Sequence, residues 1–470
     1  MSDADGLDAV GLAAAVRRGD LSPRESVTTA IDRIERLDPR LNAVVGRRFE
    51  AALDEVERGL PDGPLTGVPT LIKPLGADVA GLPTTRGSRL FADKVALADS
   101  ELVRRYRAAG MVVLGTTNTP EHGFSASTEP LLHGPTRNPW RDTHSPGGSS
   151  GGAGAAVASG MVPVAHASDG GGSIRIPASM CGLFGLKPSR GRISPAPYPS
   201  TLAGLTSVQH ALTRTVRDSA LLLDVGAGTL PGEAYGAARP TGTFSEAVGR
   251  DPGRLRIGLV TSLRNGPDTH PDCVAAAEHG ARIAESLGHE IVPMDATWDL
   301  ARVQSTSGVL MGTAFVAAVE ERLAELGRGL GDDDLEPFSR VLLEHYRTLS
   351  AGDLVRALRA AQLIGWEVGR IFEQVDVLLT PVLCRPTPEL GHLDTRRPDA
   401  MYERAIHFSG WTSTFNVTGM PAMSVPLAAD ATGLPLGVHV VADHAREDLL
   451  LSLAGQLEVA APWPALDATT

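Results

Sequence analysis

Residues 149–173 read SSGGAGAAVASGMVPVAHASDGGGS, and the interpretation of the whole chain starts from this stretch. It begins inside a glycine–serine run, 147–152, and ends with a second run, 170–173, so two loops without bulky side chains flank one short element. In such a run, successive backbone N–H groups can converge on a developing negative charge. The residues predicted to form this oxyanion hole are Gly170, Gly171, Gly172 and Ser173.

A flexible glycine–serine linker is the alternative interpretation of the same two runs. However, the segment 153–161 is small and apolar with good helix propensity, and the segment 173–177, SIRIP, is neither polar nor repetitive. Because structured segments border both runs, the sequence favours two functional loops over a linker.

Composition and charge exclude several classes of protein. The 470 residues can bury a sizeable core, and a net charge of -12 without a long basic run argues against a nucleic-acid partner. The N-terminus is acidic, and no apolar run reaches the length of a membrane span. The cysteines Cys181, Cys273 and Cys384 are widely spaced, which predicts neither a disulfide framework nor a zinc site. We therefore expect a cytoplasmic protein with no membrane partner, metal or cofactor.

Hydrophobic periodicity predicts an α/β protein. Residues 7–18 and a helix that begins at Ser22 and ends at Asp38-Pro39 form an expected helical arm, 1–60, packed on a catalytic domain, 61–470. Beyond the arm, helix, glycine and strand alternate. Further helices are expected at 101–109, 273–287 and most of 300–372, and strands at 67–73, 111–114, 255–260, 290–292, 375–379, 423–427 and 437–441. Residues 231–252 resemble a linker.

Ser173 is the candidate nucleophile because it directly follows three glycines. A serine hydroxyl needs a base, either a histidine or an alternative such as a lysine, and none of the 13 histidines stands in a recognisable motif. Lys73 ends a buried apolar run. A lysine in such a place commonly extends its ammonium into water, but full burial would lower its pKa enough to make it a base. The residues alone leave both roles of Lys73 open.

A second candidate nucleophile is Ser149, because residues 147–151 read GGSSG and match the G-x-S-x-G elbow of α/β-hydrolase esterases. That motif requires a strand immediately before the serine. Here the preceding residues, NPWRDTHSP at 138–146, read as a loop. The elbow is therefore the less favoured interpretation.

Long motifs along the chain resemble the amidase signature hydrolases. They are SPGGSSGG at 145–152, DGGGSIRIPA at 169–178, CGLFGLKPSRGRIS at 181–194, GVP at 67–69 and FNVTGMPA at 415–422. The resemblance covers nearly the whole chain. It implies an α/β fold of the amidase signature type, in which a mixed, twisted β-sheet core is covered by helices on both faces.

The resemblance also implies a Ser-cis-Ser-Lys triad. Ser173 would attack the carbonyl carbon, and Ser149, following a cis peptide bond from Gly148, would relay the proton to neutral Lys73. Backbone N–H groups of residues 170–173 would hold the oxyanion. The expected reaction is hydrolysis of a carbon–nitrogen bond other than a peptide bond, through an acyl-enzyme.

Four other residues receive a role from the same resemblance. Asp169 and Arg175 would support the catalytic loop, although a purely structural ion pair is the alternative for these two. Phe124 and Ser125 would form part of the pocket wall. Many relatives carry aspartate where this chain has Pro74, so the pKa of the adjacent Lys73 is expected to differ from that in those relatives.

The motifs also narrow the substrate class. The run STEP at 127–130 is most similar to bacterial enzymes that act on linear or cyclic aliphatic amides, including nylon oligomers. The run QHAL at 209–212 replaces a motif of the subunit that makes amidated transfer RNA, which disfavours a glutamine-dependent amidotransferase. A small-molecule amide is the expected substrate, with a carbamate or an ester as alternatives on the same triad. Whether the chain forms a homodimer is left open.

Overall fold

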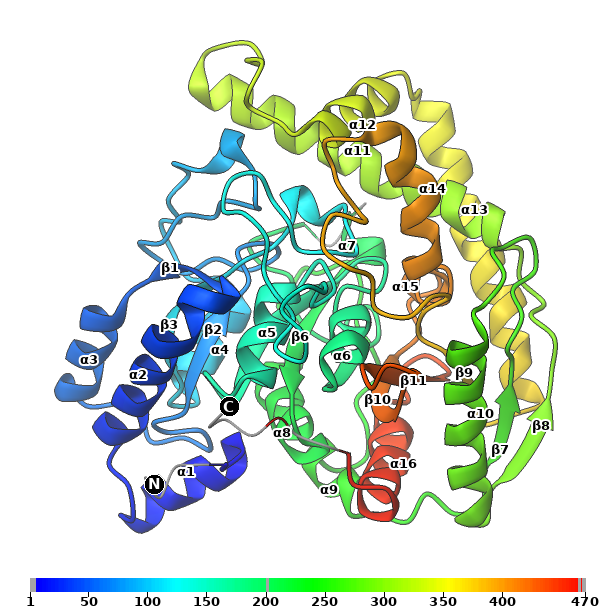
Figure 1. The fold of residues 1–470 in the computed structure, drawn as a ribbon, viewed down its shortest axis with the longest axis horizontal. Coiled ribbons are helices and arrows are strands. Elements are labelled where there is room, and N and C mark those ends of the chain that lie inside the picture. Colours follow the sequence, from blue (N-terminus) through cyan, green and yellow to red (C-terminus); the bar gives the residue numbers. More distant parts are fainter. Residues whose placement is uncertain (1–5, 200–202, 464–465, 467–470) are drawn as a thin grey trace.

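The computed structural model describes residues 6–199, 203–463 and 466, and its core is an eleven-stranded sheet (Figure 1). In the sheet the strands lie in the order β1-β3-β2-β4-β6-β5-β10-β11-β9-β7-β8. Their bounds are β1 Val44–Arg47, β2 Pro69–Ile72, β3 Val112–Thr117, β4 Val164–Asp169, β5 Phe184–Lys187, β6 Val208–Thr213, β7 Arg256–Leu259, β8 Glu290–Pro293, β9 Val377–Pro381, β10 Ala422–Ala429 and β11 Pro435–Ala442.

The sheet is mixed, as predicted. Strand β2 is parallel to β3 and β4, and β7 is parallel to β8 and β9. Between these two groups, β4, β6, β5, β10, β11 and β9 pair antiparallel, and β1 adds an antiparallel edge to β3. Because β2 and β4 are parallel neighbours, their carboxyl ends lie on the same edge of the sheet.

Helices connect and cover the strands (Figure 1). Their bounds are α1 Ala9–Arg18, α2 Pro23–Leu41, α3 Phe49–Arg58, α4 Glu101–Ala108, α5 Gly151–Ala158, α6 Arg175–Cys181, α7 Ala203–Thr206, α8 Val216–Gly226, α9 Phe244–Val248, α10 Pro271–Ser286, α11 Leu300–Leu326, α12 Pro337–Arg347, α13 Ala351–Gly369, α14 Pro398–Ser409, α15 Thr414–Val417 and α16 Glu447–Ala460, with 3₁₀ turns at Arg89–Phe91, Glu121–Gly123 and Arg370–Glu373.

Both faces of the sheet are covered, because successive strand residues enter different hydrophobic clusters. Leu71 packs in a cluster with α2, α3 and α5, whereas the next residue, Ile72, packs with α1, α4 and α8. In the other half of the sheet, Val441 packs with α13 and α15, and Val440 packs with α10 and α16. The expectation of an α/β fold with helices on both faces is confirmed.

Three local predictions differ from the structure. The arm 1–60 is not purely helical, because it also supplies the edge strand β1, a four-residue segment too short to show a pattern. Helix α2 continues through Pro39 to Leu41, since the proline falls in its last turn and Asn42 N–H still closes on the Asp38 carbonyl at 2.8 Å. The linker-like segment 231–252 contains α9, whose Phe244 and Ala247 are buried.

No helix in the described part of the chain has the length and apolar character needed to cross a membrane.

Candidate active site

Lys73 directly follows β2 at the carboxyl edge of the sheet and is fully buried. Its amine nitrogen, Nζ, lies within hydrogen-bond distance of three hydroxyl oxygens: Ser149 Oγ at 2.7 Å, and Ser150 Oγ and Ser168 Oγ at 3.0 Å each. Ser168 belongs to β4, the parallel neighbour of β2, which explains why two distant segments meet here. The structure therefore excludes the solvent-directed role of this lysine.

The three hydroxyls around Lys73 are not equivalent. The Ser168 hydroxyl donates to the Leu75 carbonyl at 3.0 Å, and the Ser150 hydroxyl donates to the Ser168 carbonyl at 3.2 Å. Both are therefore acceptors toward the amine. Within the described residues, the Ser149 hydroxyl donates to no other acceptor, so its proton is free to point at a neutral amine.

Burial lowers the pKa of Lys73 to about 7, although the negative charge of Asp169 acts in the opposite direction. No carboxylate among the described residues forms an ion pair with this amine. A substantial fraction of Lys73 is consequently neutral near pH 7, which a base requires.

Ser149 follows a loop, and its peptide bond with Gly148 is cis. The residue is 2% exposed, and α5 begins two residues later at Gly151. No strand immediately precedes Ser149 within the described residues 142–148, so the strand–turn–helix context of an α/β-hydrolase elbow is missing. The structure does not support Ser149 as an elbow nucleophile.

Ser173 lies between β4 and α6 and is partly exposed, in contrast to the buried Ser149. Ser173 and Ser149 line the same cavity, of about 620 Å³, together with Gly148, Gly170 and Gly171. The predicted nucleophile and relay are thus brought to one site.

The backbone donors of the glycine run are not all available. Gly172 N–H donates to Asp169 Oδ1 at 2.7 Å, so this member of the predicted oxyanion hole is committed to a carboxylate. The described residues offer no acceptor to the N–H groups of Gly170, Gly171 and Ser173. Gly172 has φ +136, and a Cβ there would lie 2.3 Å from Thr412 Oγ1. This glycine is needed for the shape of the loop, which sequence reasoning could not separate from a donor role.

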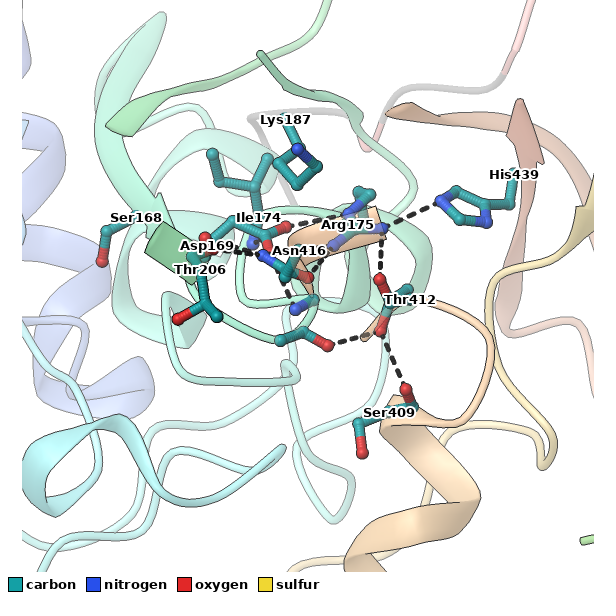
Figure 2. Close-up of polar contacts among 12 residues, drawn as sticks. Ser168, Asp169, Ile174, Arg175, Lys187, Thr206, Ser409, Thr412, Asn416 and His439 are labelled. Carbon is teal, nitrogen blue, oxygen red and sulfur yellow. Dashed lines mark hydrogen bonds and ion pairs between the residues drawn. The ribbon is translucent and has the colours of Figure 1, made fainter. Parts of the chain in front are cut away.

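Asp169 and Arg175 form a fully buried ion pair behind the glycine run (Figure 2). Arg175 Nε donates to Asp169 Oδ2, and Arg175 Nη2 donates to Asp169 Oδ1, both at 2.9 Å. Burial acts to raise the pKa of Asp169, but the charge and hydrogen bonds of Arg175 hold it below its usual value. Asp169 also accepts the N–H groups of Gly172 and Ile174. The pair therefore fixes the loop on both sides of Ser173.

Three residues that sequence reasoning did not assign complete this cluster (Figure 2). Asn416 Nδ2 donates to Asp169 Oδ1 at 2.8 Å, and its Oδ1 accepts from Arg175 at 2.7 Å. The Thr412 hydroxyl donates to the Gly171 carbonyl at 2.6 Å. His439 Nε2 lies 3.0 Å from Arg175, and burial keeps the pKa of this histidine well below its usual value. The only sequence signal for His439 is that it is a polar residue inside an apolar strand.

Phe124 and Ser125, the expected pocket residues, both line the cavity. Phe124 meets Phe315 of α11 edge to face, with ring centroids 4.9 Å apart. Met311, from the same helix, also lines the cavity. Helix α11 could not be related to the pocket from sequence, because it lies more than a hundred residues beyond the catalytic motifs.

Known proteins resemble this chain over nearly its whole length. The family model described as Amidase matches residues 25–451. The 6-aminohexanoate-cyclic-dimer hydrolase of Paenarthrobacter ureafaciens is 37% identical over 97% of this chain and 95% of its own length. The putative amidase AmiC of Mycobacterium tuberculosis strain H37Rv is 38% identical over 98% of this chain and 96% of its own.

Solved structures show the same fold. A 6-aminohexanoate cyclic dimer hydrolase complexed with substrate superimposes with a TM-score of 0.91 at 36% identity, covering 97% of each chain. A bacterial aryl acylamidase of the amidase signature family has a TM-score of 0.89 at 29% identity, covering 98% of this chain and 97% of that one. The chain is therefore a hydrolase of carbon–nitrogen bonds. It belongs to the amidase signature family, as its motifs indicated.

Proposed function

We propose that this amidase cleaves a small-molecule carboxylic amide through an acyl-enzyme on Ser173, with Ser149 as proton relay and neutral Lys73 as base. The observation that carries the proposal is the set of three hydroxyls around Lys73 Nζ. A neutral amine has two N–H donors and one lone pair. Ser150 and Ser168 take the two N–H donors, because their own protons are used elsewhere. The lone pair is left for the Ser149 proton.

Proton transfer then follows a single direction. Ser149 gives its proton to Lys73 Nζ and takes the proton of Ser173, whose oxygen forms a bond to the substrate carbonyl carbon. The negative carbonyl oxygen is placed against the N–H groups of Gly170, Gly171 and Ser173, where one such donor contributes roughly 3 to 4 kcal/mol in other serine hydrolases. When the carbon–nitrogen bond breaks, Ser149 protonates the leaving nitrogen and recovers a proton from Lys73.

A water molecule completes the cycle by the same route. It gives a proton to Ser149 as its oxygen attacks the acyl carbon, and Ser173 leaves with the proton that returns from the relay. The products are a carboxylic acid and an amine or ammonia. Because the curated relatives include hydrolases of a cyclic amide, an aliphatic linear or cyclic amide is the substrate class we favour.

Covalent labelling with a fluorophosphonate tests the assignment. We expect intact mass and peptide mapping to place one adduct on Ser173 of the wild type and none on Ser173→Ala. Ser149→Ala should label slowly at Ser173, since the relay is missing. Ser159→Ala, at the end of α5 and away from the cavity lining, is the matched control and should label like the wild type. An adduct on Ser149 that persists in Ser173→Ala would overturn the proposal.

A further inference from the structure

Arg86 lies in the loop after β2, and its backbone is tied to both catalytic segments. Its N–H donates to the Pro74 carbonyl at 3.1 Å, and its carbonyl accepts the His122 N–H at 2.8 Å. Pro74 follows the catalytic lysine in sequence. Gly123, which follows His122, is so close to the relay that a Cβ there would lie 3.0 Å from Ser149 Oγ. Arg86 is therefore held beside the reacting groups.

The backbone of Arg86 has an uncommon conformation. Its φ is 52, a left-handed value that costs free energy for a residue with a long side chain. The residue nevertheless lines the catalytic cavity and is only partly exposed. Its guanidinium carbon lies 4.6 Å from the centre of the Phe91 ring and 5.9 Å from that of Tyr198. These two rings fix the orientation of the guanidinium.

Arg86 places a positive charge in the lining of the cavity. No carboxylate among the described residues forms an ion pair with it. Asp78 already accepts the Tyr198 hydroxyl at 2.7 and 2.8 Å and the Thr84 hydroxyl at 2.7 Å, and the Tyr198 hydroxyl also interacts with the Arg86 side chain. A guanidinium has five N–H donors in a planar fork that matches a carboxylate.

The other charged residues of the cavity do not offer an equivalent site. Arg190 donates to the carbonyls of Leu205, Asn416 and Val417. Glu233 accepts the Ser194 hydroxyl, and Glu321 is exposed. Burial, assisted by the Arg86 charge, lowers the pKa of His122 to about 3, so this neighbour is neutral. Among the described lining residues, Arg86 is thus the cation that has donors to spare.

We propose that Arg86 binds a carboxylate on the substrate, so that the preferred substrates are amides of an apolar chain or ring that carries an acidic group. The inference rests on the proposed amide hydrolysis and specifies its substrate class. The apolar walls built by Phe124, Met311 and Phe315 would hold the carbon skeleton, and the fork of Arg86 would pair with both carboxylate oxygens. The acidic group can belong to the acyl part or to the amine part of the substrate.

Three matched anilides test this inference. Hexananilide is neutral, adipic acid monoanilide carries a carboxylate at the end of the acyl chain, and N-hexanoyl-4-aminobenzoate carries one on the amine part. For the wild type, we expect kcat/KM to be at least about 10-fold higher for one of the two acids than for hexananilide, mainly through KM, as a charge-assisted pair would give. The acid that is preferred identifies the side on which Arg86 acts.

Variants separate recognition from structure. Arg86→Gln should bring the acid-to-neutral ratio close to one, and Arg86→Lys should retain part of the preference because it keeps the charge but loses the fork. Arg89→Gln removes an exposed arginine nearby and should leave the ratio unchanged. Equal loss on all three anilides in Arg86→Gln would show a merely structural role. A wild type that prefers the neutral hexananilide over both acids would also overturn the inference.

Binding to Ser173→Ala keeps this test independent of turnover. Calorimetry with the same anilides should show tighter binding of the preferred acid, and Arg86→Gln in the same background should remove the difference. If Ser173 is not labelled and no anilide is hydrolysed, the proposed function fails. If hydrolysis proceeds but neither turnover nor binding distinguishes acid from neutral anilide, only the role of Arg86 fails.

Discussion

Two fully buried lysines, Lys73 and Lys187, follow the same physical rule but differ in what surrounds them. Burial lowers the pKa of each amine to about 7. Lys73 Nζ faces three hydroxyls and adjoins the cavity through Ser149. Lys187, at the end of β5, donates to the Pro188 carbonyl at 2.9 Å, and the described residues place no hydroxyl within hydrogen-bond distance of its amine.

The comparison shows that a low pKa alone does not define a base. Both amines can be neutral at pH 7, so both have a free lone pair. Only Lys73 has a hydroxyl proton directed at that lone pair and a route from there to a substrate. In its protonated form, Lys187 instead adds a positive charge near Asp169, which helps to keep that carboxylate ionised. Four experiments can break or sharpen this distinction.

The largest expected effect is on activity. Lys73→Met should lower kcat/KM by about 10²–10⁴-fold, the usual contribution of a general base. Lys73→Arg should lose as much, because an arginine keeps the charge but cannot be deprotonated. Lys187→Met is the matched control, and we expect it to retain activity within about 10-fold. Steady-state kinetics on one amide checks all three, and an equal loss in Lys187→Met would contradict the assignment of the base.

The second effect is on stability and concerns the buried ion pair of Asp169 and Arg175. Asp169→Asn leaves Arg175 buried without its carboxylate and should reduce the free energy of unfolding by about 3–5 kcal/mol. Denaturant unfolding measures this loss. The double variant Asp169→Asn with Arg175→Met should recover part of it, because no unpaired charge remains. An unchanged unfolding midpoint in the single variant would show that the pair does not hold the loop.

The third effect is the pH dependence of stability. The pKa of Lys187 is about 7 in the folded protein and about 10.4 in an unfolded chain, so the unfolded state binds more protons between these values. Stability therefore rises with pH across that window, by at most about 1.4 kcal/mol per pH unit for this group. Lys187→Met removes the contribution. The difference in thermal midpoint, Lys187→Met minus wild type, should be largest below pH 7 and should decrease toward pH 10. A difference that does not change with pH would contradict the low pKa of Lys187.

Much of the fold could be predicted because short apolar runs between glycines and helices mark buried strands. The strands β2, β3, β7, β8, β9, β10 and β11 all overlap predicted runs, whereas no strand was predicted at β4, β5 or β6. The edge strand β1 was missed, since four residues directly after a helix carry no periodic signal. Helix α9 was missed because a five-residue helix in a segment rich in glycine and proline depends on packing against α8 and α16.

Some residues of the candidate site could be predicted from the sequence and others could not. Lys73, Ser149 and Ser173 lie in local motifs, and the resemblance to a known family supplied their roles, which stay predictions. Thr412 contacts Gly171, and His439 contacts Arg175, in each case across more than 200 residues of sequence. Only the folded arrangement of the sheet and of the segment before α15 brings them there. The hydrogen bond from Gly172 N–H to Asp169 depends on the conformation of the loop, which a run of glycines does not determine.

The smallest expected effect is a shift in the pH profile caused by Pro74. In the wild type, kcat/KM should rise with pH and reach half its maximum near pH 7, as Lys73 loses its proton. Pro74→Asp would place a carboxylate next to the lysine and favour the charged amine, so the midpoint should move upward by about one pH unit. Pro74→Asn is the neutral control and should leave the midpoint in place. Because Lys187 Nζ donates to the Pro188 carbonyl and not to the Ser149 hydroxyl, Lys187→Met should also keep the wild-type midpoint. If the midpoint moves in Lys187→Met but not in Pro74→Asp, Lys187 rather than Lys73 controls the titration.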